Sequence, residues 1–471
     1  MGRYISYTIG LALLIAIGSL LIQYGSSRDA VQIPDDREEV VFWHFWGGED
    51  RDVVDDVVRR FNESQSEYFV RAIAMPGNNL QAKLFLSVAG GDPPDIINQD
   101  DPVVPDWAHR GVIDSLEQVA PAEEVAAVRD FLLPAAEKLS TYEGEMFALC
   151  NGLDIRALYY NQTLLDKYGL EPPETTNDLD RIAEAIAPQG SGDVQRYGYL
   201  PDTRRLWAWG YVFGGSFYDD VDHQATIDSP AVDAALKWMA SYRDKYSADR
   251  IAAFRTGDQS LPGKTFPLLP IRDDEMFGRY AVVMDGQWQV RKILALQQRR
   301  EAEGLPAPSF GVCPLPIPAE LPPGVTARSN AGWVNGNFFV FPRNARNRSG
   351  AWEFAKFWIG YQSTDQAAKT CIEGGWIPVS QSVVESPEFK KYTDANPLFG
   401  KFVELASSPN QFPTPPVVGA AMFKRAVESA SYDAMFTDKP IEEILQSTNQ
   451  TIQQQLDRQQ RRLEEAPKAT R

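Results

Sequence analysis

The sequence predicts an α/β fold in which helices cover mostly parallel sheets. Apolar stretches typical of strands lie at 39–46, 68–75 and 95–97, where Val, Ile and aromatic side chains alternate or run together. Two stretches with apolar residues on one helical face separate them, at 49–64 and 80–89. Because parallel strands require a long crossover between them, the order strand–helix–strand–helix–strand indicates a doubly wound sheet.

The boundaries of these elements follow from local chemistry. Gly47 and Gly48 end the first strand, and the acidic residues in the first turn of the helix 49–64 suit the positive end of its dipole. Two glycines follow the helix 80–89, and Asp92 with the prolines after it turns the chain into the next strand.

The same alternation continues through the rest of the chain. Further strands are predicted at 157–161, 278–284, 310–314 and 337–341. Helices are predicted at 163–168, 178–187, 231–245 and throughout the chain from 351, ending in a long polar helix at 441–465. A length of 471 residues exceeds one compact core, so more than one domain is expected.

The composition argues against several functions. The chain has 46 basic and 64 acidic side chains, and its net charge of −18 repels a phosphate backbone, so no nucleic-acid partner is expected. Cys150, Cys313 and Cys371 lie far apart with no CxxC motif, and the chain has only 3 His, so no metal site is expected. One cysteine pair forms a disulfide, or all three are buried free thiols; the sequence leaves both alternatives open.

No catalytic residue is predicted. The sequence contains no GxSxG, HExxH or GxGxxG motif. Acidic pairs such as Asp100 and Asp101 do not establish a glycosidase, because an acidic chain contains many of them. No cofactor is therefore expected.

The N-terminus has the pattern of an export signal. An apolar run at 8–22 suits the core of a signal peptide and is shorter than the roughly 20 residues that cross a bilayer. Gly25 and Ser27 suit cleavage after Ser27, which predicts a signal peptide at 1–27 and a polar linker at 28–39. A retained signal anchor is the alternative, and because no Cys follows the run, a lipoprotein anchor is excluded. Either way the remaining chain is expected in a periplasmic or extracytoplasmic location.

Six segments, in order along the chain, resemble one known family. They are VVFWHFWGG at 40–48; AGGDPPDII at 89–97; LYYN at 158–161 with YGLEPP at 168–173; GRYAVVMDGQW at 278–288; GVCPLP at 311–316 followed by Gly332-Trp333; and GWIP at 375–378. Each segment alone is a weak signal. In this order they resemble the family 1 extracellular solute-binding proteins of bacterial ABC importers, the group that contains the maltose-binding protein.

The resemblance implies two doubly wound α/β lobes joined by hinge strands, the periplasmic binding protein type II fold, with a ligand cleft between the lobes. The first lobe is expected to take 40–150 plus about 285–345, and the second 151–284 plus about 346–471. The resemblance also implies a monomer that binds a carbohydrate and partners the membrane permease subunits of an ABC importer, without enzymatic activity. The alternatives are a membrane-tethered ligand sensor, a binder of glycerol-phosphate-type ligands, and a carbohydrate-active enzyme.

The family's pattern places ligand contacts at the ends of strands, where open sheets bind their ligands. The matching positions are Phe45, Trp46, Gly47 and Gly48 after the first strand; Gln99, Asp100 and Asp101 after the third; Asn151 and Asp154 at the crossover; Asp202 and Arg204; the stacking residue Trp288; and Gly332, Trp333 and Trp376 in loops lining the cleft. The maltose-binding protein has an aromatic residue in the loop after the third strand, and this chain has none there, which leaves the contacts of that loop open.

Two of the aromatic residues carry a specific expectation. Trp46 and Trp288 each stand beside glycine at a strand end, so both are expected to be partly exposed in the cleft, where an aromatic face covers a sugar ring. Asp154 and Arg204 have an alternative role as a salt bridge across the hinge.

The charges of the matching positions favour a neutral polyol as the ligand. Four acidic residues stand against Arg204, and carboxylates accept hydrogen bonds from hydroxyls but repel phosphate. The four are Asp100, Asp101, Asp154 and Asp202.

Overall fold

The computed structural model describes residues 33–75, 77–100, 102–187, 196–259, 266–272 and 274–465. The expected signal segment 1–27 and the predicted site residue Asp101 lie outside the described residues. Among the described helices, none combines the length and the apolar character needed to cross a membrane.

A five-stranded sheet forms the core of the first lobe, with the strand order β2-β1-β3-β13-β6. β1, β2 and β3 run parallel, and β13 pairs antiparallel with β3 and β6. The strands are β1 (Glu38–His44), β2 (Tyr68–Ala74), β3 (Ile96–Gln99), β6 (Leu149–Asp154) and β13 (Asn335–Val340). The crossover helices are α2 (Glu49–Ser64) and α3 (Gly77–Gly90). The predicted doubly wound arrangement of this segment is confirmed.

Short elements complete the first lobe between β3 and β6. They are α4 (Val104–His109), α5 (Leu116–Val119), α6 (Ala122–Phe131), α7 (Pro134–Ser140), β4 (Thr141–Tyr142) and β5 (Glu145–Met146). Trp107 of α4 is fully buried in the same hydrophobic cluster as Phe42 of β1.

A smaller sheet forms the second lobe, with the order β10-β7-β11 and both outer strands antiparallel to β7. Tyr197 adds a parallel bridge to Tyr280 beside β10, so the segment from 197 runs in the direction of β10 along the sheet's edge. The strands are β7 (Arg156–Asn161), β10 (Val282–Gly286) and β11 (Phe310–Cys313).

Helices and two short strands surround the second sheet and bury a second hydrophobic cluster that includes Trp207, Trp209 and Tyr242. These elements are α8 (Gln162–Tyr168), α9 (Thr176–Ala185), η1 (Thr203–Arg205), α10 (Leu206–Val212), β8 (Tyr218–Asp219), β9 (Gln224–Ala225), α11 (Pro230–Tyr246) and α12 (Ala248–Gln259). α13 (Gln289–Ala302) follows β10, and its buried Val290 and Ile293 belong to the first hydrophobic cluster.

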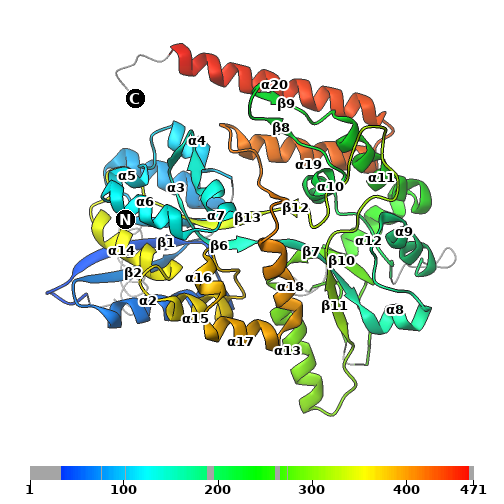
Figure 1. The fold of residues 1–471 in the computed structure, drawn as a ribbon, viewed down its shortest axis with the longest axis horizontal. Helices are drawn as coiled ribbons and strands as arrows, with labels where there is room; N and C mark the ends of the chain where they lie inside the picture. The colour runs from blue at the N-terminus through cyan, green and yellow to red at the C-terminus, as the bar shows by residue number, and fades with distance from the viewer. Residues whose placement is uncertain are drawn as a thin grey trace, which may run out of the picture.

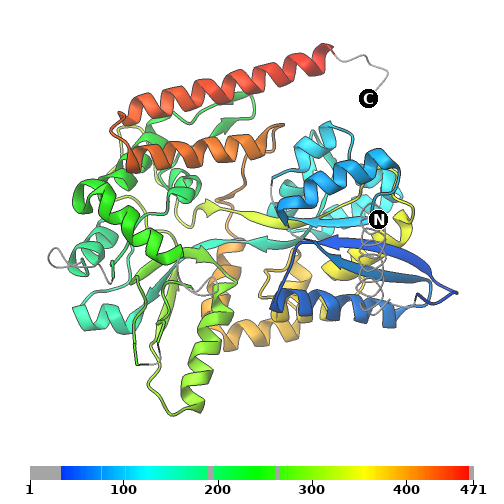
Figure 2. The ribbon, with the colours of Figure 1, turned by 180° about the vertical axis from the view of Figure 1, so that it is seen from behind.

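Two strand-to-strand crossings join the sheets, as Figures 1 and 2 show near the centre of the molecule, and the C-terminal helices pass between the lobes a third time. Only Ile155 separates the end of β6 from the start of β7. The second crossing runs through Val334, between β12 (Gly332–Trp333) and β13, and β12 pairs with β14 (Gln411–Phe412). These crossings match the hinge strands expected between the two lobes.

The C-terminal helices divide between the lobes. Those that contact the first lobe are α14 (Arg348–Ile359), α15 (Thr364–Gly374), α16 (Gln381–Val384) and α17 (Pro387–Ala395). α18 (Pro397–Ala406) contacts β11, and α19 (Ala420–Phe436) and α20 (Ile441–Glu465) pack on α11. In Figure 1 the last two helices lie one beside the other along one side of the molecule.

This division corrects the expected lobe boundaries in two places. The segment 346–471 is not confined to the second lobe, because Phe354 and Trp358 of α14 pack against Phe42 of β1. Within 285–345, β13 joins the first sheet as expected, but β11 pairs with β7 of the second. Periodicity shows that a helix has a buried face without showing which core receives it. The remaining boundaries stay a prediction.

All three cysteines are free thiols, Cys150 and Cys371 buried and Cys313 half-buried. Of the two alternatives left open by the sequence, the structure therefore supports free thiols.

Candidate ligand-binding site

The carboxyl-terminal edge of the second sheet gathers polar residues from distant parts of the sequence. β10 ends at Asp285 and Gly286, and the segment beside it leads from Tyr199 to Asp202 and then η1. β7 runs in the opposite direction and therefore begins at this same edge, with Arg156. In open α/β sheets, ligands bind outside the carboxyl ends of the strands, so this edge is where a site is expected.

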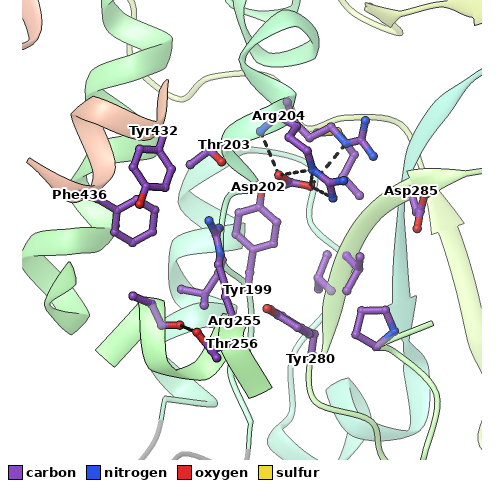
Figure 3. A pocket seen from close by; sticks show the side chains of 17 residues that line it. Tyr199, Asp202, Thr203, Arg204, Arg255, Thr256, Tyr280, Asp285, Tyr432 and Phe436 are labelled. Atoms are coloured by element: carbon purple, nitrogen blue, oxygen red, sulfur yellow. Dashed lines mark hydrogen bonds and ion pairs between the residues drawn. The ribbon is translucent and has the colours of Figure 1, made fainter. Parts of the chain in front are cut away.

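A cavity of about 630 Å³ lies at this edge, and Figure 3 shows the side chains around it. Its polar lining comes from η1, α12 and the end of β10, and its aromatic lining includes two side chains from the end of α19. The lining includes Asp202, Thr203, Arg204, Arg205, Arg255, Thr256 and Asp285 among polar residues and Tyr199, Tyr280, Tyr432 and Phe436 among aromatic ones. This volume and mixture are typical of a small-molecule site.

Asp202 organises the polar wall of the cavity. Its carboxylate accepts hydrogen bonds from Arg204 Nη2 at 2.8 Å, from Arg204 Nε at 3.1 Å and from the backbone N–H of Arg204 at 2.9 Å. Burial opposes the ionisation of Asp202, but the charges of Arg205 and Arg204 outweigh it and hold its pKa well below the usual range. The partner of Arg204 is therefore Asp202, and the alternative of an Asp154–Arg204 salt bridge is not what the structure shows.

A second cluster adjoins the cavity where β6 passes into β7. Gln287 donates from Nε2 to Asp154 Oδ1 at 3.0 Å and to the carbonyl of Leu153 at 3.1 Å, while its Oε1 accepts from the backbone N–H of Ile155 at 3.1 Å. Burial raises the pKa of Asp154, although the neighbouring charge of Arg156 opposes the shift. Gln287 thus holds Asp154 in place at the crossing between the lobes.

Arg156 lies between two indole rings. Its guanidinium carbon is 4.5 Å from the centre of the Trp288 ring and 5.4 Å from that of Trp333, within the range of cation–π attraction. Burial and the like charge of Arg205 lower its pKa to about 10, so Arg156 remains charged at neutral pH.

Trp288 depends on a glycine beneath it. A Cβ atom on Gly286 would lie 2.2 Å from Cζ3 of Trp288, so no other residue fits at 286 with the ring in this position. Trp288 is half-buried, in agreement with the expected partial exposure.

The corresponding edge of the first sheet is filled with aromatic residues. Trp46 is 6% exposed; its ring stacks on Trp358 with 5.6 Å between ring centres and lies 5.1 Å from Trp376. The expectation that Trp46 is partly exposed in the cleft is therefore wrong. Trp376 is also buried, since the three indoles bury one another.

The other predicted residues spread between core and surface. Gln99, Asn151, Gly332 and Trp333 are buried, Phe45, Asp100 and Asp154 are half-buried, and Gly47 and Gly48 are exposed. Asp202 and Arg204 line the cavity, and Asp154 and Trp288 adjoin it through Arg156. A ligand contact by any of these residues stays a prediction.

Several residues at this edge escaped the sequence analysis, above all Arg156, Arg205 and Asp285. Arg156 left one signal, because it is a charged residue within the otherwise apolar strand 155–160. Arg205 and Asp285 left none, since charged residues at loop ends are ordinary in an acidic chain.

A sequence profile for the family described as bacterial extracellular solute-binding protein matches residues 56–397. A probable sugar-binding periplasmic protein of Rhizobium meliloti is 26% identical over 259 residues, which cover 54% of this chain and 58% of that protein. The sn-glycerol-3-phosphate-binding periplasmic protein UgpB of Brucella abortus is 26% identical over 236 residues, which cover 46% and 51%. The chain thus spans about half the length of these curated relatives.

Solved structures share the fold over nearly the whole chain. CpMnBP1 with mannotriose bound has a TM-score of 0.68 at 22% identity and covers 88% of this chain and 99% of its own. The sugar-binding protein MalE from Xanthomonas citri has a TM-score of 0.69 at 18% identity and covers 91% and 100%. Two lobes, continuous hinge strands and a cavity at the strand ends define the class of two-lobed solute-binding proteins. The chain belongs to the bacterial extracellular solute-binding protein family.

Proposed function

We propose that this protein captures a sugar or oligosaccharide outside the cytoplasmic membrane and delivers it to the membrane permease subunits of an ABC importer. The observation that carries the proposal is the cavity of about 630 Å³, which is lined by both charged planar side chains and aromatic rings. Carbohydrates require this combination, because their hydroxyls need hydrogen-bond partners and their C–H faces need apolar cover.

The relatives support the same ligand class. One curated relative is named as a sugar-binding periplasmic protein, and a solved structure of the same fold holds mannotriose. The UgpB relatives are named for sn-glycerol-3-phosphate, so a glycerol-phosphate-type ligand is the second candidate.

Capture would proceed by closure of the two lobes about their crossings. Ligand first contacts the cavity of the second lobe, where the Asp202–Arg204 pair is already formed. Rotation about Ile155 and Val334 then brings the first lobe over it and excludes water, which strengthens each polar contact.

We propose that the site binds its ligand and does not hydrolyse it. A glycosidase needs one carboxyl held as an acid and a second free to act as base or nucleophile. Here Asp202 is held by Arg204, Asp154 accepts from Gln287, and Asp285 accepts from Gln289 Nε2 at 2.8 Å. We therefore propose that the protein binds its ligand without turnover, acts as a monomer, and lies outside the membrane, released or tethered by 1–27.

A thermal-shift screen of the purified protein against mono- and oligosaccharides and glycerol 3-phosphate tests the proposal. A saturable rise in melting temperature without product formation is expected for at least one of these compounds. Asp202→Asn should reduce that rise, because it removes the charge that orients Arg204. Arg346→Gln should leave it unchanged, since Arg346 forms an exposed ion pair with Asp92.

Two outcomes contradict the proposal. Product formation would show that the protein is an enzyme. A screen in which none of the compounds raises the melting temperature would contradict the proposed binding function. The tethered sensor would instead bind ligand yet fail to support uptake when the protein is expressed with the permease subunits of an ABC importer.

A further inference from the structure

Two arginine side chains at the edge of the second sheet have hydrogen-bond donors without an acceptor among the described residues. Arg156 is 7% exposed, and its Nε and Nη1 atoms have no hydrogen-bond partner among the residues that the structure describes. The side chain of Arg205 is 12% exposed; its Nε lies 3.8 Å from Asp202 Oδ2, too far for a hydrogen bond. Buried charged donors without acceptors are costly, so these atoms are the strongest candidates for ligand contacts.

Two aromatic neighbours hold the Arg156 guanidinium. Trp288 and Trp333 both contact it, at 4.5 and 5.4 Å from their ring centres. A guanidinium stacked on aromatic faces keeps its donors at its edge, where they suit two oxygens of one planar or tetrahedral group.

Three carboxylates of this region already accept hydrogen bonds. Asp202 accepts from Arg204, and Asp154 accepts from Gln287. Asp285 accepts from the backbone N–H of Gly286 and from the side chain of Gln289. Among the described residues, the unpartnered donors here lie on two cations, Arg156 and Arg205, whereas the unpartnered acceptor, Oε1 of Gln289, is neutral.

Resting on the function proposed above, we propose that the ligand is a sugar or polyol bearing an oxyanion, a carboxylate or a phosphate, which the guanidinium groups of Arg156 and Arg205 bind. A hydroxyl fits this place less well, because it brings a proton of its own that needs an acceptor. An oxyanion only accepts. A bound oxyanion would also offset the repulsion between the two guanidinium groups, which is evident because the charge of Arg205 lowers the pKa of Arg156.

The wider charge distribution agrees with an anionic group at this edge. The cavity is lined by Arg204, Arg205 and Arg255 against Asp202 and Asp285, in a chain whose net charge is −18. Glu428 of α19 also acts on Arg204 and Arg205, but burial raises its pKa, which disfavours its charged form. An anion would be repelled by most of the protein surface and attracted here.

This inference replaces the neutral polyol expected from the sequence. That expectation counted Asp100 and Asp101 in the site, whereas Asp100 does not line the cavity and Asp101 lies outside the described residues. It also counted Asp202 as free and counted neither Arg156 nor Arg205.

Calorimetric titration with matched ligands tests the inference. The neutral set is glucose, maltose and maltotriose; the carboxylate set is glucuronate and galacturonate; the phosphate set is glucose 6-phosphate and glycerol 3-phosphate. We expect saturable binding in one anionic set, and which set binds identifies the carboxylate or the phosphate. The Kd should rise several-fold between about 50 and 500 mM NaCl, because salt screens the ion pair.

Variants separate the arginine contacts from general effects. Arg156→Gln and Arg205→Gln should each weaken binding of the anionic ligand about tenfold or more and reduce its salt dependence, because each removes a charge-assisted contact. Arg156→Lys should recover part of the affinity by restoring charge without the planar fork. Arg346→Gln is the control for loss of one surface arginine and should match the unaltered protein. If Arg156→Gln does not fold, Arg205→Gln and the salt dependence of the unaltered protein decide.

The inference is overturned if no anionic compound of the panel binds, or if the tightest ligand is neutral with a Kd that is insensitive to salt. Binding of a neutral sugar in that experiment would leave the proposed function standing. If none of the compounds binds, both this inference and the proposed function are contradicted.

Discussion

The two lobes use the same topological feature, the edge at which the first and third strands of one sheet and β10 of the other end, in opposite ways. In the first lobe this edge is closed by Trp46, Trp358 and Trp376, which stack on one another and are buried. In the second lobe it opens into a cavity whose wall is the Asp202–Arg204 pair. Topology thus shows where a binding protein can hold a ligand, while side-chain packing decides which of two equivalent edges remains open. Four predictions test this contrast.

Trp46→Ala should have the largest effect, and on stability. Removing a buried indole leaves a cavity beside Trp358 and Trp376, which typically costs roughly 3–5 kcal/mol in the free energy of unfolding. Chemical denaturation measures the loss. Trp288→Ala, at the half-buried ring of the other edge, should cost less than half as much. If Trp46→Ala abolished binding while leaving the unfolding transition in place, the first edge would be a ligand surface after all.

His44, beside Trp46, should make the stability of the protein depend on pH. Burial and the charge of Arg51 lower its pKa to about 4, and its Nδ1 has no hydrogen-bond partner among the described residues. In the unfolded chain a histidine protonates near 6.5. Between pH 6.5 and 4 the unfolded state therefore binds the proton first, and the free energy of unfolding falls by up to about 3 kcal/mol.

Denaturation of the protein at pH 7.5 and 4.5 measures the effect of His44. His44→Phe should remove this part of the decrease, whereas His109→Gln, at an exposed position on α4, should retain it. An identical pH dependence in the unaltered protein and in His44→Phe would contradict the assignment.

Trp288→Ala should act on binding. Its ring covers Arg156, so its loss removes an aromatic contact and the orientation of the guanidinium together. We expect affinity to fall at least about tenfold, roughly 1.4 kcal/mol, with the fold intact. Titration calorimetry combined with a melting curve measures both quantities. Unchanged affinity with a lowered melting temperature would instead make Trp288 a core residue.

Asp100→Asn should have the smallest effect. Asp100 follows β3 at the closed edge, and its backbone carbonyl accepts from Asn335 Nδ2 at 2.6 Å, a bond that the substitution keeps. Affinity is expected to change by less than about twofold, in contrast to Asp202→Asn, which disrupts the cavity wall. A larger loss for Asp100→Asn than for Asp202→Asn would place the binding energy in the first lobe.

Local patterns were enough to predict the elements of the fold. The helix predicted at 49–64 is observed as Glu49–Ser64, and each predicted strand has an observed counterpart within a few residues. Apolar periodicity, glycine breaks and acidic first turns act over a single turn or strand, so they can be read along the chain. Which core receives α14 or β11 depends on long-range packing, and there the sequence was misleading.

The candidate site was predictable only where a residue resembles the family's pattern. Asp202 and Arg204 line the cavity, and their contact with a ligand stays a prediction, whereas Arg156 and Arg205 were not recognised. Arg156 and Arg205 matter because their donors have no acceptor in the folded protein. That environment is formed by Asp202, Trp288 and Gln287, which come from other segments of the sequence. The predicted exposure of Trp46 was wrong for the same reason, because its burial requires helix α14 and the loop after α15.

The side chain of Gln287 stiffens the crossing between the lobes at β6 and β7. It bonds the carbonyl of Leu153, the carboxylate of Asp154 and the amide of Ile155, and so braces the one residue that separates β6 from β7. A joint braced on consecutive residues resists bending, and opening has to stretch or break these bonds together. The Ile155 amide should then exchange with deuterium only when its hydrogen bond to Gln287 breaks. Its exchange rate would therefore report how often the lobes separate.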